Sequence, residues 1–228
     1  MAHIVDAEVR HARRRDDLIY AAISAIEEEG VGVGMGRIAE LAGVSRPIFY
    51  RHFKDREELD ELVRRRALAL LMHEMLPQFG FSKPPMQTLR GVITAYVTWV
   101  VSHPRLHQFL ESGSSGSGNV DHCAVMAKNE YITVISNYFG AVVDLSEDAA
   151  RFRVPLASGM VGFADAVMRR WLMDPEPKMP DTELAEFLTV SLWMMLDGNL
   201  RSVGIVIDPD RPLEEVIWPA RRRHPAPD

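Results

Sequence analysis

Cysteine is almost missing from this sequence of 228 residues. Cys123 is the only one, so no disulfide within the chain and no cysteine-based zinc site can form. Apolar runs are short, and none reaches the length of about 18 residues that a membrane-spanning helix needs. Residues 1–17 are charged and lack the apolar core of a secretory signal peptide. We therefore expect a cytoplasmic protein without a membrane partner.

A large charge excess is missing too. The net charge is -6, which argues against a protein that coats nucleic acid along its whole surface. Hydrophobic residues make up 47% of the chain, enough to bury a sizeable core. Residues 35–56 are the exception in charge: they hold five basic side chains against Glu40 and Asp55, which leaves +3. This window is a candidate surface for a polyanion.

No segment alternates apolar and polar residues in the way of a strand. Helical spacing of apolar residues is found instead, for example at Leu18, Ala22 and Ile26, and an all-α fold is the prediction. The predicted helices cover about 12–29, 35–42, 46–53, 55–75, 86–102, 104–110, 122–139, 146–173 and 181–202. Pro155 is expected to kink the eighth helix, and the glycine–serine segment 112–118 to form a mobile loop.

Two short helices joined at Gly43 are the pattern of a helix-turn-helix. Ser45 is suited to cap the second helix, where Pro47 stands in the first turn, and Asp55 to Glu58 reads as a capping box for the next helix. The spacing predicts a small core of Ile38, Leu41, Val44, Phe49 and Phe53. It places Pro47, Ile48, Tyr50 and Arg51 on the opposite side, which could enter a DNA major groove.

The same stretch resembles the helix-turn-helix of TetR-family transcriptional regulators. The family pattern is an IA-x-x-AGVS core followed by YxHF and a lysine. It corresponds here to Ile38-Ala39, Ala42-Gly43-Val44-Ser45 and Tyr50-Arg51-His52-Phe53-Lys54. The resemblance covers residues 12–70. Two positions depart from it: Gly34 replaces a capping Ser or Thr that contacts phosphate, and Ile48 replaces a Thr or Ser of the recognition helix.

The resemblance implies a three-helix DNA-binding domain at 10–58 and a helical ligand-binding and dimerisation domain at 59–207. The proline and arginine content of residues 208–228 predicts a flexible tail. The resemblance also implies a homodimer built on helices 146–173 and 181–202, and repression of a palindromic double-stranded operator that a small, mainly apolar effector releases. The expected DNA-binding residues are Gly34, Arg37, Ser45, Arg46, Pro47, Ile48, Tyr50, Arg51, His52 and Lys54. The expected effector-binding residues are Tyr96, Trp99, His103, His107, Phe109, Met126, Phe163, Asp165 and Met168.

Other interpretations stay open at this point. His103 and His107 have a spacing that can bind a metal, but Pro104 separates them and no third ligand is evident. His122 and Cys123 are neighbours in sequence, which does not make a catalytic dyad. The sequence therefore predicts no cofactor, metal or catalytic site. The alternatives are a constitutive DNA-binding protein, an all-helical enzyme and a helical adaptor. Arg64-Arg65-Arg66 is expected to be a solvated helix face.

Overall fold

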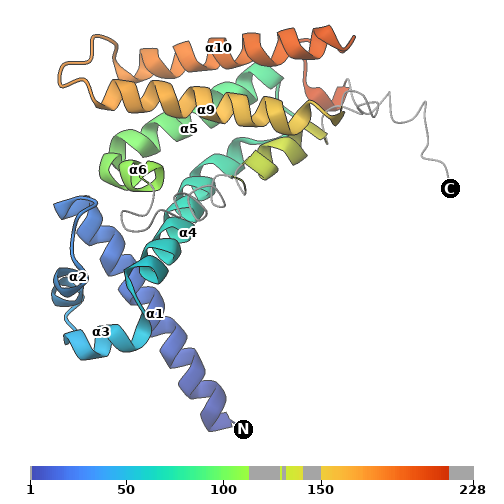
Figure 1. The fold of residues 1–228 in the computed structure, drawn as a ribbon. Coiled ribbons are helices and arrows are strands. Elements are labelled where there is room, and N and C mark those ends of the chain that lie inside the picture. Colours follow the sequence, from blue (N-terminus) through green and yellow to red (C-terminus); the bar gives the residue numbers. More distant parts are fainter. Residues whose placement is uncertain (1, 113–128, 130–131, 141–149, 216–228) are drawn as a thin grey trace. The chain divides into compact units, whose positions relative to one another are not determined.

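A computed structural model describes residues 2–112, 129, 132–140 and 150–215, with side chains from residue 13 onward (Figure 1). Helices and turns account for the regular structure of these residues, so the all-α prediction is confirmed. The elements are α1 (Ala2–Glu29), α2 (Met35–Leu41), α3 (Arg46–His52), α4 (Arg56–Met75), the 3-10 turn η1 (Leu76–Gln78), α5 (Pro85–Ser102), α6 (Pro104–Glu111), α9 (Arg153–Leu172) and α10 (Asp181–Ser202). Residues 129 and 132–140 are also helical.

Two helix boundaries differ from the predicted ones. α1 begins at Ala2, well before the first apolar residue of its stripe. α9 begins at Arg153, after a turn at residues 151–152, so the prediction of one kinked helix over 146–173 is wrong. Pro155 stands in the first turn of α9, where a missing N–H group costs no hydrogen bond, and it therefore starts the helix well instead of bending it.

Contacts divide the chain into two units. The first unit comprises Met1–Leu70 and His103–Ala127, and the second comprises Leu71–Ser102 and Lys128–Asp228. The grouping differs from the expected boundary at residue 58, because most of α4 and all of α6 belong with the helix-turn-helix. Segments 113–128 and 141–149 contain Met126, Cys123 and most of the glycine–serine segment, which lie outside the described residues.

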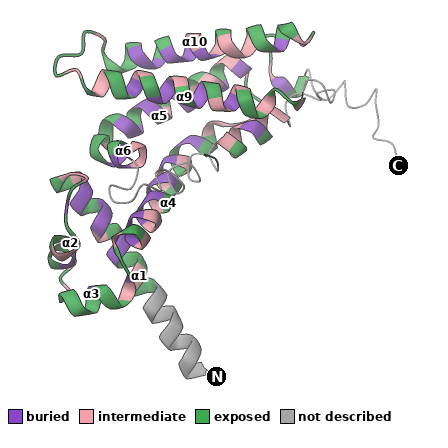
Figure 2. Ribbon diagram, viewed as in Figure 1, coloured by how far each residue is buried: buried purple, intermediate pink, exposed green. Residues whose placement is uncertain are grey.

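The core of the first unit is the apolar stripe of α1 together with residues from α2, α3 and α4. Buried side chains are Leu18, Ile19, Ala22, Ile23, Ile26, Ile38, Phe49, Phe53, Leu59 and Val63 (Figure 2). Gly30 ends α1 with a φ of 95°, and its N–H donates to the Ile26 carbonyl, which is the usual way for glycine to stop a helix.

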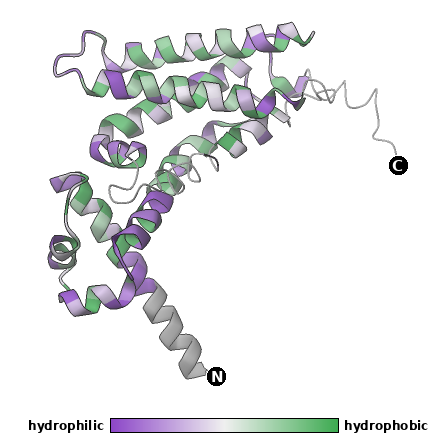
Figure 3. Cartoon of the chain, viewed as in Figure 1, coloured by the Kyte–Doolittle hydropathy of each residue, from purple (hydrophilic) through white to green (hydrophobic). Residues whose placement is uncertain are grey.

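The second unit is built on α10, which packs against α5 and α9. Hydrophobic residues recur along these three helices, whereas the start of α4 is hydrophilic (Figure 3). The chain after α10 turns at Gly204, whose φ is 80°, and its Ile207 and Leu213 pack with Leu200 in a small buried cluster.

This packing corrects the expectation of a flexible tail from residue 208. The Met86 N–H donates to the Pro209 carbonyl at 3.3 Å, and the Glu214 N–H donates to the Phe81 carbonyl at 2.9 Å. Leu213 retains only 2% exposure. Residues 208–215 are therefore part of the second unit, because one buried leucine and two backbone hydrogen bonds anchor them, while residues 216–228 lie outside the described part.

The three consecutive arginines of α4 do not form the solvated face that the sequence suggested. Only Arg65 is exposed, in an ion pair with Glu61 at 2.6 Å. Arg66 lies over the Tyr20 ring at 4.5 Å. Arg64 is 2% exposed. A run of one residue type on a helix points in three directions about 100° apart, so its members meet different neighbours.

Candidate functional site

The helix-turn-helix is formed by short-range signals in the sequence. Gly34 precedes α2 in extended conformation, and its carbonyl accepts hydrogen bonds from the Arg37 and Ile38 N–H groups. Gly43, with a φ of 65°, makes the turn to α3. Ser45 occupies the N-cap position of α3, but its side chain makes no capping hydrogen bond, so its hydroxyl is on the exposed side of the turn.

α3 has one buried face and one exposed face. Phe49 is fully buried, and its ring lies 5.1 Å from that of Phe53. The expected outer residues Pro47, Ile48, Tyr50 and Arg51 are all exposed, as are Ser45, Arg46 and Lys54. The aromatic pair thus anchors α3 in the core of the first unit. The other side of this short helix is open to a ligand as large as DNA.

Leu41 corrects the predicted core. Its side chain is 41% exposed, while Ala39 on the same helix is buried at 1%. α2 has only seven residues, and the closest helix, α1, meets it on the side of Ile38 and Ala39. Val44 is half-buried beside the turn. Helical spacing alone did not show which face of α2 is buried. The position of α1 determines it.

Arg46 lies across α2 at Gly36. A Cβ atom at residue 36 would stand 2.8 Å from Nη2 and 2.9 Å from both Cζ and Nε of the Arg46 guanidinium. No side chain other than hydrogen fits under the guanidinium in this position. Gly36 therefore allows the first residue of α3 to rest on the backbone of α2.

The other expected polar contacts differ in how far their charges are compensated. Arg37 donates to Glu40 at 2.9 Å and to Glu29 at 2.7 Å, and these hydrogen bonds raise the pKa of its guanidinium. Lys54 is largely exposed and has one acidic neighbour, Asp55, at 3.9 Å. His52 is half-buried, with its ring near Phe53. Lys54 thus offers a more accessible positive charge than Arg37.

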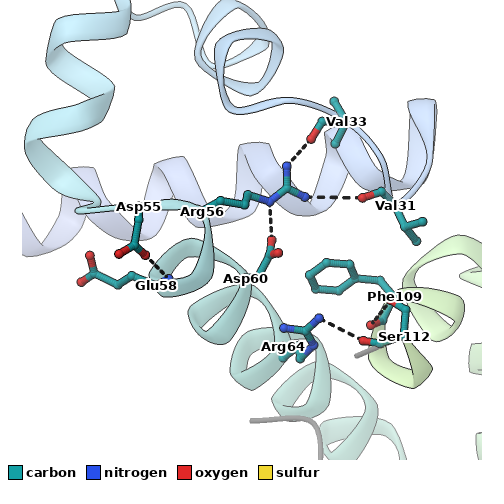
Figure 4. Close-up of polar contacts among 9 residues, drawn as sticks. All are labelled: Val31, Val33, Asp55, Arg56, Glu58, Asp60, Arg64, Phe109 and Ser112. Carbon is teal, nitrogen blue, oxygen red and sulfur yellow. Dashed lines mark hydrogen bonds and ion pairs between the residues drawn. The ribbon is translucent and has the colours of Figure 1, made fainter. Parts of the chain in front are cut away.

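Arg56 attaches the loop before α2 to α4. Its guanidinium donates to the carbonyl groups of Val31 and Val33 and pairs with Asp60 at 2.7 Å (Figure 4). Asp60 is 9% exposed, whereas the Arg56 side chain is 32% exposed, so the carboxylate of the pair is the shielded partner. One side chain therefore fixes the path of the chain into the helix-turn-helix, which limits how far α2 can shift against α4.

The start of α4 has one of the two hydrogen bonds of the predicted capping box. The Glu58 N–H donates to the Asp55 carboxylate at 2.9 Å (Figure 4). The Glu58 carboxylate accepts from the Lys54 N–H at 2.7 Å, one residue before the position that the motif uses. Glu58 also forms an ion pair with Arg15 of α1, whose guanidinium lies over the Phe53 ring at 5.6 Å. The end of α3 is thus bound to both neighbouring helices.

α6 is attached to α1 and α4 within the first unit. Arg105 donates to the carbonyls of Glu27 and Glu28, which lie in the last turn of α1 and have no helical partner. Arg64 of α4 donates to the Ser112 carbonyl at 3.0 Å and covers the Phe109 ring at 4.6 Å (Figure 4). A displacement of α6 would therefore be felt directly by two helices that support α3.

A cavity of about 100 Å³ lies within the second unit. Its walls come from α5, α9, α10, the helical segment 132–140 and the chain after α10. The aliphatic and aromatic lining includes Phe79, Leu89, Val92, Ile93, Ile135, Phe139, Leu156, Met160, Val161, Leu192, Leu196, Leu200, Val203, Ile207 and Leu213. A mostly apolar cavity with few polar groups is typical of a small-molecule site.

Polar side chains lie at separate places along this cavity. Tyr138 donates to the Gly80 carbonyl at 2.7 Å, and burial raises the pKa of its hydroxyl, so the hydroxyl is neutral near pH 7. Thr88 is 4% exposed, and its hydroxyl lies near that of Tyr138, where it partly offsets the rise in the pKa of Tyr138. Tyr96 donates to the buried carboxylate of Asp165 at 2.9 Å.

The predicted effector residues coincide with this cavity only in part. Tyr96 and Asp165 line it, whereas Trp99, Phe163 and Met168 belong to the second unit but do not. His107 and Phe109 are in α6 of the first unit, and His103 stands at its N-cap, with Nδ1 3.6 Å from Glu27. Helical periodicity identified buried residues. A cavity, however, forms only where the apolar faces of neighbouring helices leave space between them.

Thr88 and Arg153 are cavity residues that the sequence reasoning missed. Thr88 had a detectable signal: it stands four residues before Val92 and eight before Tyr96, so it is a polar residue on an apolar helix face. Arg153 had no such signal in the sequence, because its position at the cavity depends on where α9 begins.

The chain has relatives among known regulators. Residues 18–62 match the model of the family described as bacterial regulatory proteins, tetR family. A helix-turn-helix transcriptional regulator of Mycobacterium tuberculosis is 28% identical over 84% of this chain and 80% of the relative. The transcriptional activator FasR of Mycolicibacterium smegmatis is 27% identical over 72% of this chain and 74% of FasR.

Solved structures share the fold. A TetR-family transcriptional regulator from Streptomyces coelicolor has a TM-score of 0.69 at 20% identity, over 93% of this chain and 97% of that one. AibR, solved with isovaleryl coenzyme A and operator DNA, has a TM-score of 0.55 at 15% identity, over 78% and 97% of the two chains. Within the described ranges, no helix combines the length and apolar character needed to cross a membrane.

Proposed function

We propose that this chain, a DNA-binding transcriptional regulator of the TetR family, is a repressor that binds a near-palindromic operator as a homodimer. A small, mainly apolar effector enters the cavity of the second unit and releases the DNA. The observation that carries this proposal is the exposed face of α3. The opposite face is fixed by the buried Phe49–Phe53 pair.

The side chains on this face divide into two groups by chemistry. Tyr50, Arg51 and Lys54 are exposed donors suited to phosphate, whose contacts position a protein without reading sequence. Arg46 can donate to a guanine edge, and Ile48 can contact a thymine methyl group. Gly34, Ser45 and His52 flank them, and Arg37 contributes less because two carboxylates already compensate its charge.

Selection from random duplexes followed by titration tests the DNA-binding surface. We expect a dyad-symmetric site with half-site centres about 34–36 Å apart or more, and affinity that falls steeply with salt. Tyr50→Phe and Lys54→Ala should weaken binding to all DNA sequences alike. Arg46→Ala and Ile48→Ala should instead change the base preference. Lys178→Ala, exposed in the second unit, is the control. Wild-type binding by all four variants would refute this surface.

The dimer proposal is supported by exposed apolar residues on α10. Phe187, Val190 and Met194 are 45%, 37% and 68% exposed in the single chain, and their spacing puts them on one helix face. A continuous apolar strip of this kind usually marks an interface. Light scattering should give twice the monomer mass, and Phe187→Glu with Met194→Glu should give a monomer, while Val206→Glu, also exposed, should not.

The effector proposal is supported by the cavity and by AibR, which was solved with an acyl thioester and its operator. An effector releases DNA only if it favours a conformation with lower operator affinity, and such coupling is typically about 1–3 kcal/mol. A thermal-shift screen of apolar metabolites, followed by operator titration with each hit, tests this. Hits that leave operator affinity unchanged would favour the constitutive DNA-binding alternative. A reporter gene distinguishes repression from the activation named for FasR.

A further inference from the structure

We infer that the cavity binds an amphipathic anion, with its charged head at Arg153 and its apolar tail between α5, α9 and α10. This inference rests on the proposed effector role and specifies the class of the effector. The head is a carboxylate or another anion, and the tail is short and uncharged.

Arg153 provides the positive end of the site. It is the first residue of α9, lines the cavity and is half-buried. Its guanidinium lies so close to Gly140 that a Cβ at residue 140 would overlap it, and its Nε makes only a long hydrogen bond of 3.4 Å to the Ala150 carbonyl. Within residues 2–112, 129, 132–140 and 150–215 it has no carboxylate partner. A guanidinium with spare donors at a cavity suits a carboxylate or phosphate.

A neighbouring polar side chain at this end of the cavity is exposed to solvent. Asn199, near the end of α10, is exposed and lines the cavity. Gly159 of α9 stands against Met195 of the antiparallel α10, with Sδ 3.9 Å from an added Cβ, so Arg153 and Asn199 belong to the same end of the helix pair. An anionic head there can keep part of its hydration, which lowers the cost of binding.

The opposite end carries the opposite charge. Asp165 is twelve residues after Arg153 on the same helix, or about 18 Å along its axis. Its buried carboxylate accepts a hydrogen bond from Tyr96 and would repel an anion. An anionic ligand is therefore oriented with its head toward Arg153. Between the two charges the walls are mostly apolar, with the buried Thr88 hydroxyl among them.

The size of the cavity limits the tail. A cavity of about 100 Å³ is smaller than the roughly 150 Å³ of an apolar cavity known to hold benzene. The buried part of the tail should therefore have fewer carbon atoms than benzene, and hexanoate has five beyond its carboxyl carbon. Hexanoate, 1-hexanol and hexanoyl coenzyme A are suitable probes, because they share this short tail and differ in the head. Calorimetric titration of the full chain measures the affinity for each.

The decisive variant is Arg153→Gln, with Arg170→Gln, exposed near the other end of α9, as its control. We expect Arg153→Gln to weaken hexanoate binding about tenfold or more, as for loss of a charge-assisted hydrogen bond. The same variant should leave 1-hexanol binding unchanged, Arg170→Gln should change neither, and Arg153→Lys should retain most of the hexanoate affinity. Thermal unfolding of each variant confirms that it folds.

The titration with hexanoyl coenzyme A distinguishes two possible anionic heads, a carboxylate and a phosphate. If hexanoate binds through Arg153, the head is a carboxylate; if only the thioester binds and needs Arg153, the head is a phosphate. Equal losses of hexanoate and 1-hexanol in Arg153→Gln overturn the inference, as does binding of no anionic probe. Probe binding that depends on Arg153 but leaves operator affinity unchanged sustains the inference and refutes the effector role.

Discussion

Replacement of Gly36 by alanine should separate DNA reading from folding. The added methyl group would stand 2.8–2.9 Å from three atoms of the Arg46 guanidinium, and only that flexible group needs to move. Arg46 would leave its position over α2, while the backbone of both helices stays in place. We therefore expect weaker operator binding by a protein that is no less stable.

The expected changes in stability and in operator affinity have opposite signs. Alanine is favoured over glycine within a helix by up to about 1 kcal/mol, so the free energy of unfolding should stay equal or rise. A good base contact contributes about 1–3 kcal/mol, so loss of the Arg46 contact should lower operator affinity about 5–150-fold. A general loss of structure would instead lower both quantities.

A double-mutant cycle is the assay. Operator affinity is measured by fluorescence anisotropy for wild type, Gly36→Ala, Arg46→Ala and the double variant, and stability by urea unfolding. If Gly36 acts through Arg46, Gly36→Ala should add little once Arg46 is gone. Gly34→Ala, with open space around its added Cβ, is the matched control.

Two results would refute this reasoning. Equal losses from Gly36→Ala in the presence and absence of Arg46 would mean that the glycine acts on the backbone of α2. An unchanged operator affinity for Gly36→Ala would mean that Arg46 does not read DNA from the position it has in the structure.

Three further predictions concern other contacts. Gly34→Ser should stabilise the protein by a few tenths of a kcal/mol to about 1 kcal/mol, since the site is open and extended, and should tighten operator binding through an added phosphate contact. Arg56→Gln should cost about 1–3 kcal/mol in urea unfolding, because it leaves a buried carboxylate without its cation. The Arg90 guanidinium holds the pKa of Glu186 below its usual range, so Glu186→Gln should lose at most about 1 kcal/mol at pH 7. That loss should vanish as the pH falls below about 4, through the lowered pKa of the folded state.

Each of the three has a control. Gly32→Ser tests the general effect of replacing an open glycine, and equal gains there would rule out a capping effect at Gly34. Arg65→Gln removes an exposed pair and should cost less than about 0.5 kcal/mol, and a cost equal to that of Arg56→Gln would contradict the shielding argument. A pH-independent effect of Glu186→Gln would contradict the assigned pKa.

Much of the fold follows from local sequence alone. Gly43 and Pro47 place the turn and the start of α3, the Asp55–Glu58 capping box starts α4, and α10 has the predicted bounds Asp181–Ser202. These features depend on backbone angles and on hydrogen bonds between residues a few positions apart. Such interactions are the same wherever the segment lies in the protein, so the residue pattern is sufficient to predict them.

Only the tertiary structure decided the partners of these helices. Leu41 is exposed because α1 covers the other side of α2. Arg64 is buried because Phe109 of α6 and Ser112 contact it, and Leu213 is buried because the chain turns back after α10. The placement of Arg153 at the cavity depends likewise on where α9 begins and on the glycine at position 140. Helical periodicity determines which residues share a face, but contacts between residues far apart in the chain determine which face is covered.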